Sequence, residues 1–185
     1  MQNTKISTSR RNALALWGAA AFAALSISQR AGASSSIRTG GGLAGGGSVE
    51  VQGGVANFSV FGSRFVVADQ PKPLIFGSLR WVDSNGVDLR STKIVNYGPS
   101  GGDPNARILE GFATMNGQGE HPFSLMLFDE AGPEKGADHI QLMVLPSLPA
   151  TATPEAPMAT GEPIYSSDGA LKSGDLQLLT FDFPG

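Results

Sequence analysis

The chain has 185 residues, with 25 glycines, 12 prolines, no cysteine, 13 basic and 16 acidic residues. The lack of cysteine excludes disulfides, thiol catalysis, thiolate metal sites and covalent haem attachment. Four basic residues and no acidic residue lie in the first 33, so residues 34–185 carry a formal charge of −7, which argues against nucleic acid and anionic membranes as partners because both select basic patches.

The first 33 residues have the layout of an export signal. A twin-arginine motif, Ser9-Arg10-Arg11-Asn12-Ala13-Leu14, leads into the apolar run Ala13–Ile27 and a small-residue cleavage site, Ala31-Gly32-Ala33. Arg30 precedes the cleavage site, where a positive charge disfavours the general secretory route. The run has about 15 residues, fewer than the roughly 20 of a membrane-spanning helix. We therefore predict a twin-arginine signal peptide over residues 1–33, cleaved after Ala33, a periplasmic or extracellular location, and no membrane span after cleavage.

Residues 34–48 are rich in serine and glycine and contain two glycine triplets, Gly40–Gly42 and Gly45–Gly47. This composition predicts a flexible linker. Glycine triplets also occur where a side chain would not fit against the fold. Residues 49–185 are predicted to form a single β domain, which is long enough to bury a core.

From Val49 onward, apolar residues alternate with polar ones, and no part of residues 34–185 shows a helical period. Asn85-Gly86 and Asn116-Gly117 predict tight hairpins, because Asn-Gly favours the turns that join antiparallel strands. A turn at Asp168-Gly169 predicts a C-terminal hairpin. The sequence therefore predicts an all-β fold of about eight strands, an antiparallel β-sandwich or a closed β-barrel with a hairpin meander.

Several short motifs follow one another in an order that spans residues 40–180. They are Gly40-Gly41-Gly42, Val55-Ala56-Asn57-Phe58, GSLRWVD at 77–83, LRST at 89–92, GFATMNGQG at 111–119, DHIQL at 138–142, Ile164-Tyr165 and LKSGDLQ at 171–177. This order resembles the post-COAP-1 domains of large bacterial extracellular proteins. The chain departs from that family at 146–163, which is longer and richer in proline, and at Ser173 and Asp175, where the family has glycine. The resemblance implies an extracellular β-domain and supplies no catalytic residues.

Four carboxylates within ten residues are the candidate metal ligands: Asp129, Glu130, Glu134 and Asp138. Oxygen ligands of this kind suit calcium, which is abundant outside cells. Their spacing does not match the EF-hand loop, and a solvated acidic loop is the alternative interpretation. No other cofactor is predicted. Asp83, Asn85 and Asp88 form a looser cluster around the first Asn-Gly turn.

Three further patterns have simpler explanations. Residues 98–102, Gly-Pro-Ser-Gly-Gly, match the letters of a nucleophile elbow, but no helix is predicted to follow them. His121 and His139 are the only imidazoles and fall on different predicted strands, whereas a zinc site takes three or four ligands. Trp81 with Tyr97 would suit a platform for stacking a sugar.

Most aromatic residues occur at strand spacing and are expected in the core. They are Phe58, Phe61, Phe65, Phe76, Trp81, Phe112, Phe123 and Phe128. A barrel lined in this way can be filled or can hold a small apolar ligand, and the periodicity does not distinguish the two cases.

We expect an exported, non-catalytic β-domain that acts as a structural, adhesive or interaction module, with a cell-surface partner or a second copy as its partner. The alternatives are a β-barrel that binds a small apolar ligand or calcium, and a pocket-type isomerase or cyclase.

Overall fold

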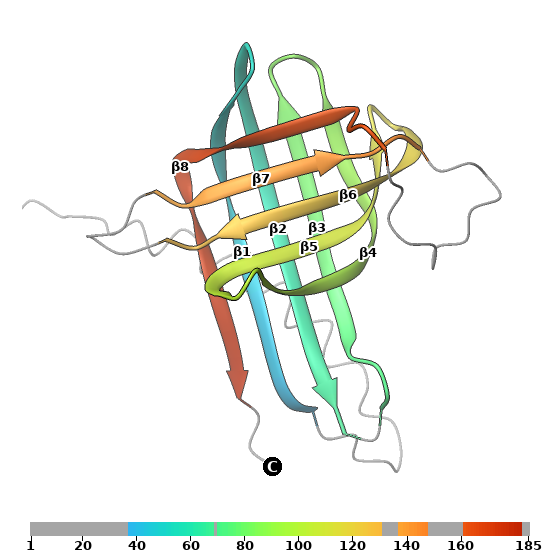
Figure 1. The fold of residues 1–185 in the computed structure, drawn as a ribbon, viewed down its shortest axis with the longest axis vertical. Coiled ribbons are helices and arrows are strands. Elements are labelled where there is room, and N and C mark those ends of the chain that lie inside the picture. Colours follow the sequence, from blue (N-terminus) through green and yellow to red (C-terminus); the bar gives the residue numbers. More distant parts are fainter. Residues whose placement is uncertain (1–36, 69, 131–136, 148–160, 183–185) are drawn as a thin grey trace, which may run out of the picture. The chain divides into compact units, whose positions relative to one another are not determined.

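The computed structural model describes residues 37–68, 70–130, 137–147 and 161–182. These residues form a closed antiparallel barrel in which consecutive strands pair and the last strand pairs with the first (Figure 1). The strands are β1 (Ile37–Val51), β2 (Gly54–Val67), β3 (Leu74–Asp83), β4 (Asp88–Ser100), β5 (Asp103–Met115), β6 (Gln118–Phe128), β7 (His139–Val144) and β8 (Tyr165–Asp182). The predicted all-β meander is confirmed, and the barrel is the correct alternative.

Among the described residues, none belongs to a helix long and apolar enough to cross a membrane.

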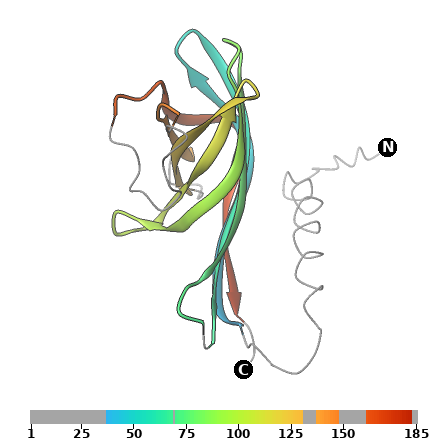
Figure 2. The ribbon, with the colours of Figure 1, turned by 90° about the vertical axis from the view of Figure 1, so that its right-hand side faces the viewer.

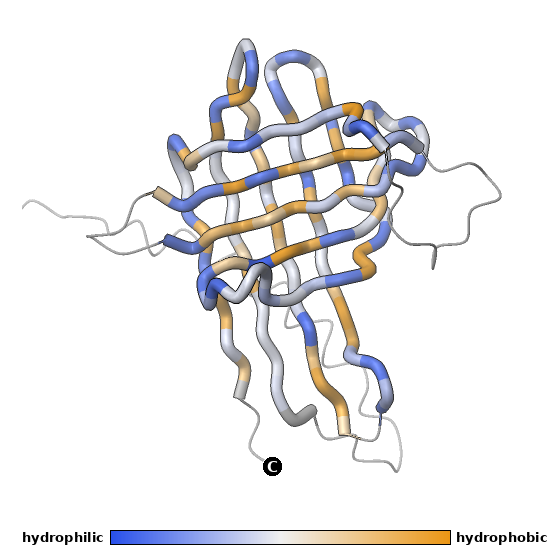
Figure 3. Tube along the Cα trace, in the orientation of Figure 1, coloured by the Kyte–Doolittle hydropathy of each residue, from blue (hydrophilic) through white to orange (hydrophobic). Residues whose placement is uncertain are grey.

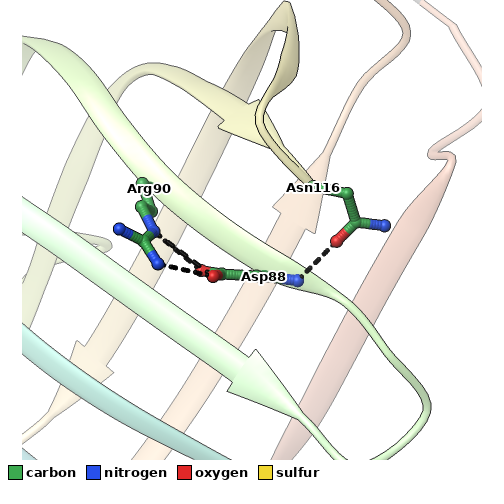
Figure 4. Close-up of polar contacts among 3 residues, drawn as sticks. All are labelled: Asp88, Arg90 and Asn116. Carbon is green, nitrogen blue, oxygen red and sulfur yellow. Dashed lines mark hydrogen bonds and ion pairs between the residues drawn. The ribbon is translucent and has the colours of Figure 1, made fainter.

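The two predicted Asn-Gly hairpins form. Gly86 has a φ of 92°, and Asn116 and Gly117 have φ angles of 54° and 74°, the left-handed backbone that tight hairpin turns require. The second turn docks on the start of β4, since the Asn116 Oδ1 accepts a hydrogen bond from the Asp88 N–H at 2.8 Å and the Asp88 carboxylate binds Arg90 at 2.8 Å (Figure 4). These contacts join the ends of two hairpins.

Most of the predicted linker is a strand. β1 begins at Ile37 and pairs with both β2 and β8, so the linker prediction for residues 34–48 is wrong from Ile37 onward. The glycines are needed for close packing: a Cβ on Gly40 would lie 2.6 Å from a ring carbon of Phe65, and one on Gly47 would lie 2.0 Å from the Ser173 carbonyl oxygen. The glycines of this segment therefore allow neighbouring strands and side chains to pack closely against β1, and they do not indicate a flexible linker.

β8 is a single strand of 18 residues and not half of a hairpin. Its first part pairs with β7, as in Gly169↔Ile140, and its second part pairs with β1, as in Leu178↔Leu43. The predicted turn at Asp168-Gly169 is wrong because both residues lie inside β8, where they pair with Gln141 and Ile140 of β7. The strand thus changes its neighbour without reversing direction.

The barrel interior is filled with apolar side chains contributed by all eight strands. Trp81 is fully buried, and its ring stacks on that of Phe58 with centroids 6.0 Å apart. An eight-stranded barrel is just wide enough for such a filling. The buried cluster comprises Leu43, Val49, Ala56, Phe58, Val60, Leu79, Trp81, Leu89, Tyr97, Leu109, Ala113, Phe123, Leu125, Leu127, Ile140, Leu142, Val144 and Leu176.

Four strands continue past the closed barrel as an open sheet, here called the extension, formed by residues 37–44, 61–67, 74–79 and 176–182 (Figures 1 and 2). β4 pairs with β3 only from Arg80↔Arg90 to Val82↔Asp88.

Beyond this short ladder β4 bends across the extension instead of running beside it. Register shifts in its pairing with β5, between Ser91 and Lys93 and between Ile94 and Asn96, mark the bend. Tyr97 then lies against Gly62, where an added Cβ would be 2.6 Å from the tyrosine ring. Among the described residues, no strand therefore pairs with the extension on the outer side of β3 or of β8.

Candidate interaction surface

An apolar patch covers the outer face of the extension. We define this outer patch as Phe65, Leu74, Phe76 and Phe181. They share one face because Phe65 pairs with Leu74, Phe76 is two residues further along the same strand, and Phe65 and Phe181 both pair with Gly40 of β1. The Phe65 ring lies 5.6 Å from that of Phe181 and 6.2 Å from that of Phe76, measured between centroids. Gly40 has no side chain to lift these rings from the sheet. Phe76 and Leu74 remain 49% and 39% exposed.

The outer patch adjoins an unpaired strand edge. The Leu79 N–H points away from β2 and donates to the Ser91 Oγ at 2.8 Å. Since a strand alternates the direction of its N–H groups, those of Ile75 and Gly77 point the same way. Within the described part of the chain, these two residues have no strand partner on that side. Figure 3 shows that apolar residues gather on this lower part of β2 and β3.

Three of the four predicted calcium ligands lie at the opposite edge, beside β8. The Asp138 carboxylate accepts hydrogen bonds from the Leu176 N–H at 2.7 Å and the Glu130 N–H at 3.1 Å, and the Asp129 carboxylate accepts one from the Leu178 N–H at 3.1 Å. Both carboxylates therefore act as caps on backbone groups of the β8 edge. The backbone of Glu130 takes part, and its carboxylate does not enter these bonds.

The electrostatics of the β8 edge follow from burial. Burial raises the pKa of Asp138 above its usual value, the two backbone N–H donors oppose this, and the nearby charges of Asp129 and Asp175 raise the pKa further. The side chain is almost fully enclosed, with 7% of the residue exposed. An enclosed carboxylate that is held by backbone hydrogen bonds stabilises the fold, because it satisfies buried backbone N–H groups.

The structure brings Asp129 and Asp138 together but shows no metal centre in the residues it describes. No three histidine, aspartate or glutamate side chains of this part of the chain are arranged to hold a metal ion. Glu134 lies outside the described residues, so the four-carboxylate calcium site stays a prediction.

The looser cluster around the first Asn-Gly turn does not converge. Asp83 is buried and its Oδ1 accepts the N–H groups of Asn85 and Val87 at 2.8 and 2.9 Å. Asp88 instead points to Arg90 on the surface.

A buried polar chain that sequence reasoning missed connects β3 to β8. The Trp81 Nε1–H donates to the Tyr165 Oη at 2.9 Å, and the Tyr165 hydroxyl donates to the Asp83 Oδ2 at 2.9 Å. Burial raises the pKa of Tyr165 to about 12, so the hydroxyl keeps its proton and the chain of donors stays complete. Asp83 and Tyr165 are 82 residues apart, and no local sequence signal links them.

Three other patterns in the sequence do not form functional sites in the described residues. Residues 98–102 form the turn from β4 to β5, with Gly101 and Gly102 at φ angles of 63° and 80° and a strand beyond, not a helix. Trp81 and Tyr97 are 0% and 3% exposed, so they cannot form a sugar platform.

The two histidines lie far apart, His121 near the start of β6 and His139 on β7 beside the end of β6. The Nδ1 of His121 lies 3.2 Å from the Leu145 carbonyl oxygen, and His139 pairs with Phe128 and binds Asp168. They cannot share a ligand.

A groove of about 630 Å³ lies between the end of β1, β7 and the first part of β8. Its two flanking carboxylates already have partners, since Glu50 binds Lys172 at 2.6 Å and Asp168 binds His139. Its lining comprises Glu50, Val51, Gln52, Gln141, Leu142, Met143, Pro163, Ser166, Ser167 and Asp168. The groove offers no converging free groups that would perform chemistry.

Comparison with known proteins gives no family for the chain: no protein-family model, curated protein or solved structure matches it.

Proposed function

We propose that this chain is an exported, non-catalytic β-barrel that works as an interaction module outside the cytoplasm, and that the extension is its contact surface. The observation that carries the proposal is the gathering of exposed apolar side chains, Leu74 and Phe76 on the outer patch and Val66 at 41% exposure on the other face, beside an unpaired strand edge. Exposed apolar patches next to a free edge are typical of interaction sites.

The filled interior supports binding at the surface over chemistry in a pocket. The residues that would line a ligand cavity in an open barrel, such as Trp81, Phe123 and Leu125, are fully buried against one another. The twin-arginine motif at Arg10-Arg11 and the resemblance to post-COAP-1 domains support a location outside the cytoplasm.

The contact surface is tested by a paired substitution. In the organism that makes the protein, the variant L74S/F76S should lose most of the envelope-associated share of the protein, measured by fractionation and immunoblotting. Met143 is 41% exposed on β7, away from the extension, so M143S is the matched control and should keep that share. Unchanged association of L74S/F76S would contradict the proposal.

The export step has its own test. Changing Arg10 and Arg11 together to lysine should trap a precursor in the cytoplasm, because the twin-arginine route requires both arginines. Unimpeded export of the double variant would remove this part of the proposal.

A further inference from the structure

We infer that two copies of this chain pair along the free β3 edges of their extensions and so join into one continuous sheet. The inference rests on the proposed function, because it names the partner of the same surface. A free edge presents N–H and C=O groups that an added strand satisfies. On β3 these are the outward groups of Ile75 and Gly77, which no other strand of the described chain meets.

The register follows from the direction of these groups. In an antiparallel pair, a residue with outward N–H and C=O groups opposes another such residue. With Ile75 on a two-fold axis, Ile75 opposes itself and Gly77 opposes Pro73 of the other copy. Gly77 donates its N–H to the Pro73 carbonyl, so the N–H that proline lacks is not needed for that bond. The contact is the same from both sides and closes as a dimer.

The side chains agree with this register. Leu74 of each copy faces Phe76 of the other in the closer, non-hydrogen-bonded type of pair. These are the two exposed residues of the outer patch. Because each copy supplies one Leu74 and one Phe76, the pairing covers both residues on both copies. Lys72 faces Ser78, so no two like charges oppose each other across the axis.

The β8 edge is unsuitable for the same role. Its outward N–H groups at Leu176 and Leu178 are already bound by Asp138 and Asp129. A strand that approached this edge would have to displace two carboxylates. A second copy therefore joins β3 to β3 and not β3 to β8, which also prevents growth into a fibre.

Charge variants test the pairing and its register together. The protein, in the form that the cell accumulates, is studied by sedimentation velocity over a range of concentrations. The parent should show a monomer–dimer equilibrium. L74K/F76K places lysine opposite lysine twice and should raise the dissociation constant by at least about tenfold, which corresponds to roughly 1.4 kcal/mol.

The matched variant L74K/F76E keeps the same positions but places opposite charges face to face. It should dimerise more tightly than L74K/F76K and weaken as salt is added. M143K should behave like the parent. The inference would be overturned if the parent stays monomeric at every concentration, or if L74K/F76E dimerises no more tightly than L74K/F76K. Melting temperatures of both double variants that match the parent's show that the barrel is intact in both.

Cysteine cross-linking gives an independent measurement, because the chain has no cysteine of its own. I75C places two thiols across the axis at the Cα separation of about 5.5 Å that a disulfide accepts. Oxidation should yield a covalent dimer. T180C occupies the β8 edge of the same sheet and should stay monomeric. Cross-linking of T180C at the rate of I75C would contradict the pairing.

The two proposals fail separately. A monomeric protein whose envelope association is lost in L74S/F76S overturns the pairing and supports the contact surface. A dimer that depends on Leu74 and Phe76, in a protein whose envelope association does not, supports the pairing and overturns the proposed function.

Discussion

The two edges of the extension differ in how their outward-pointing backbone N–H groups are satisfied. On β8, the outward N–H groups of Leu176 and Leu178 bind carboxylates, whereas on β3 the Ser91 hydroxyl meets only the N–H of Leu79. A carboxylate satisfies the donor and also repels acidic partners, while a hydroxyl does only the first. The β8 edge is therefore closed to other strands at Leu176 and Leu178, whereas the β3 edge is open at Ile75 and Gly77.

The apolar residues follow the same division. Leu74 and Phe76 on the open edge are exposed, whereas Leu178 and Leu179 near the closed edge are half-buried. Asp129 and Asp138 therefore stabilise the fold by capping the backbone N–H groups of the β8 edge.

Removing the principal cap should have the largest effect. D138A leaves the N–H groups of Leu176 and Glu130 without acceptors, and we expect the free energy of unfolding to fall by about 2–4 kcal/mol. Urea denaturation measures this loss. The control is D175A, which removes a neighbouring carboxylate that binds only the Gln177 side chain. Equal losses in D138A and D175A would show that the cap does not matter. In a D129A/D138A background, T180C should begin to cross-link, because neither carboxylate then caps the β8 edge.

Removing the single cap of the other edge should have a smaller effect. S91A deprives the Leu79 N–H of its acceptor, and we expect a loss of about 1 kcal/mol in the free energy of unfolding. Hydrogen exchange at the Leu79 amide should become faster. S78A, an exposed serine on the same edge strand, is the control and should leave that exchange unchanged. An unchanged rate of hydrogen exchange at the Leu79 amide in S91A would mean that another group protects this amide.

Lowering the pH should have a modest effect, which is to raise the stability of the parent relative to D138N. The folded state raises the pKa of Asp138 above 3.8. The contribution of Asp138 to stability therefore grows as the pH falls through its pKa in the folded state, and it is complete once the pH is below its pKa in the unfolded state. Parent and D138N should therefore diverge, with the parent gaining on the variant between neutral pH and about pH 4. The facing charges are Asp129 and Asp175. A stability difference that is constant or shrinks over this range contradicts the expected direction.

Calcium should have the smallest effect. The carboxylate oxygens of Asp129 and Asp138 already accept backbone N–H groups, so we expect no shift in melting temperature when calcium replaces a chelator. A calcium-dependent rise that is lost when both residues are changed to asparagine would instead support the predicted calcium site.

Local patterns in the sequence predict much of this fold. Alternation along β2 and β6 and the two Asn-Gly turns indicate the hairpins correctly, because side-chain direction and turn geometry depend on adjacent residues. The triplet Gly45–Gly47 misleads because close packing and flexibility select the same residue.

Non-local features are not predictable in this way. The free edge of β3 depends on where β4 bends away at Ser91, and the alternation of β3 is the same whether or not a neighbour continues beside it. The partner change in β8 likewise depends on strands far away in sequence. For the candidate site, the sequence finds the acidic residues but not their role as caps, because Leu176 is 38 residues from Asp138.

The pairing of β1 with β8 has a kinetic consequence. Contacts such as Gly40↔Phe181 and Leu43↔Leu178 join the two ends of the barrel in sequence, so ring closure has to wait until residues 171–182 have left the ribosome. Closing so long a loop costs entropy before it gains contacts, which makes folding slow and places it after synthesis. A transport route that accepts only finished folds would give such a chain the time that it needs in the cytoplasm.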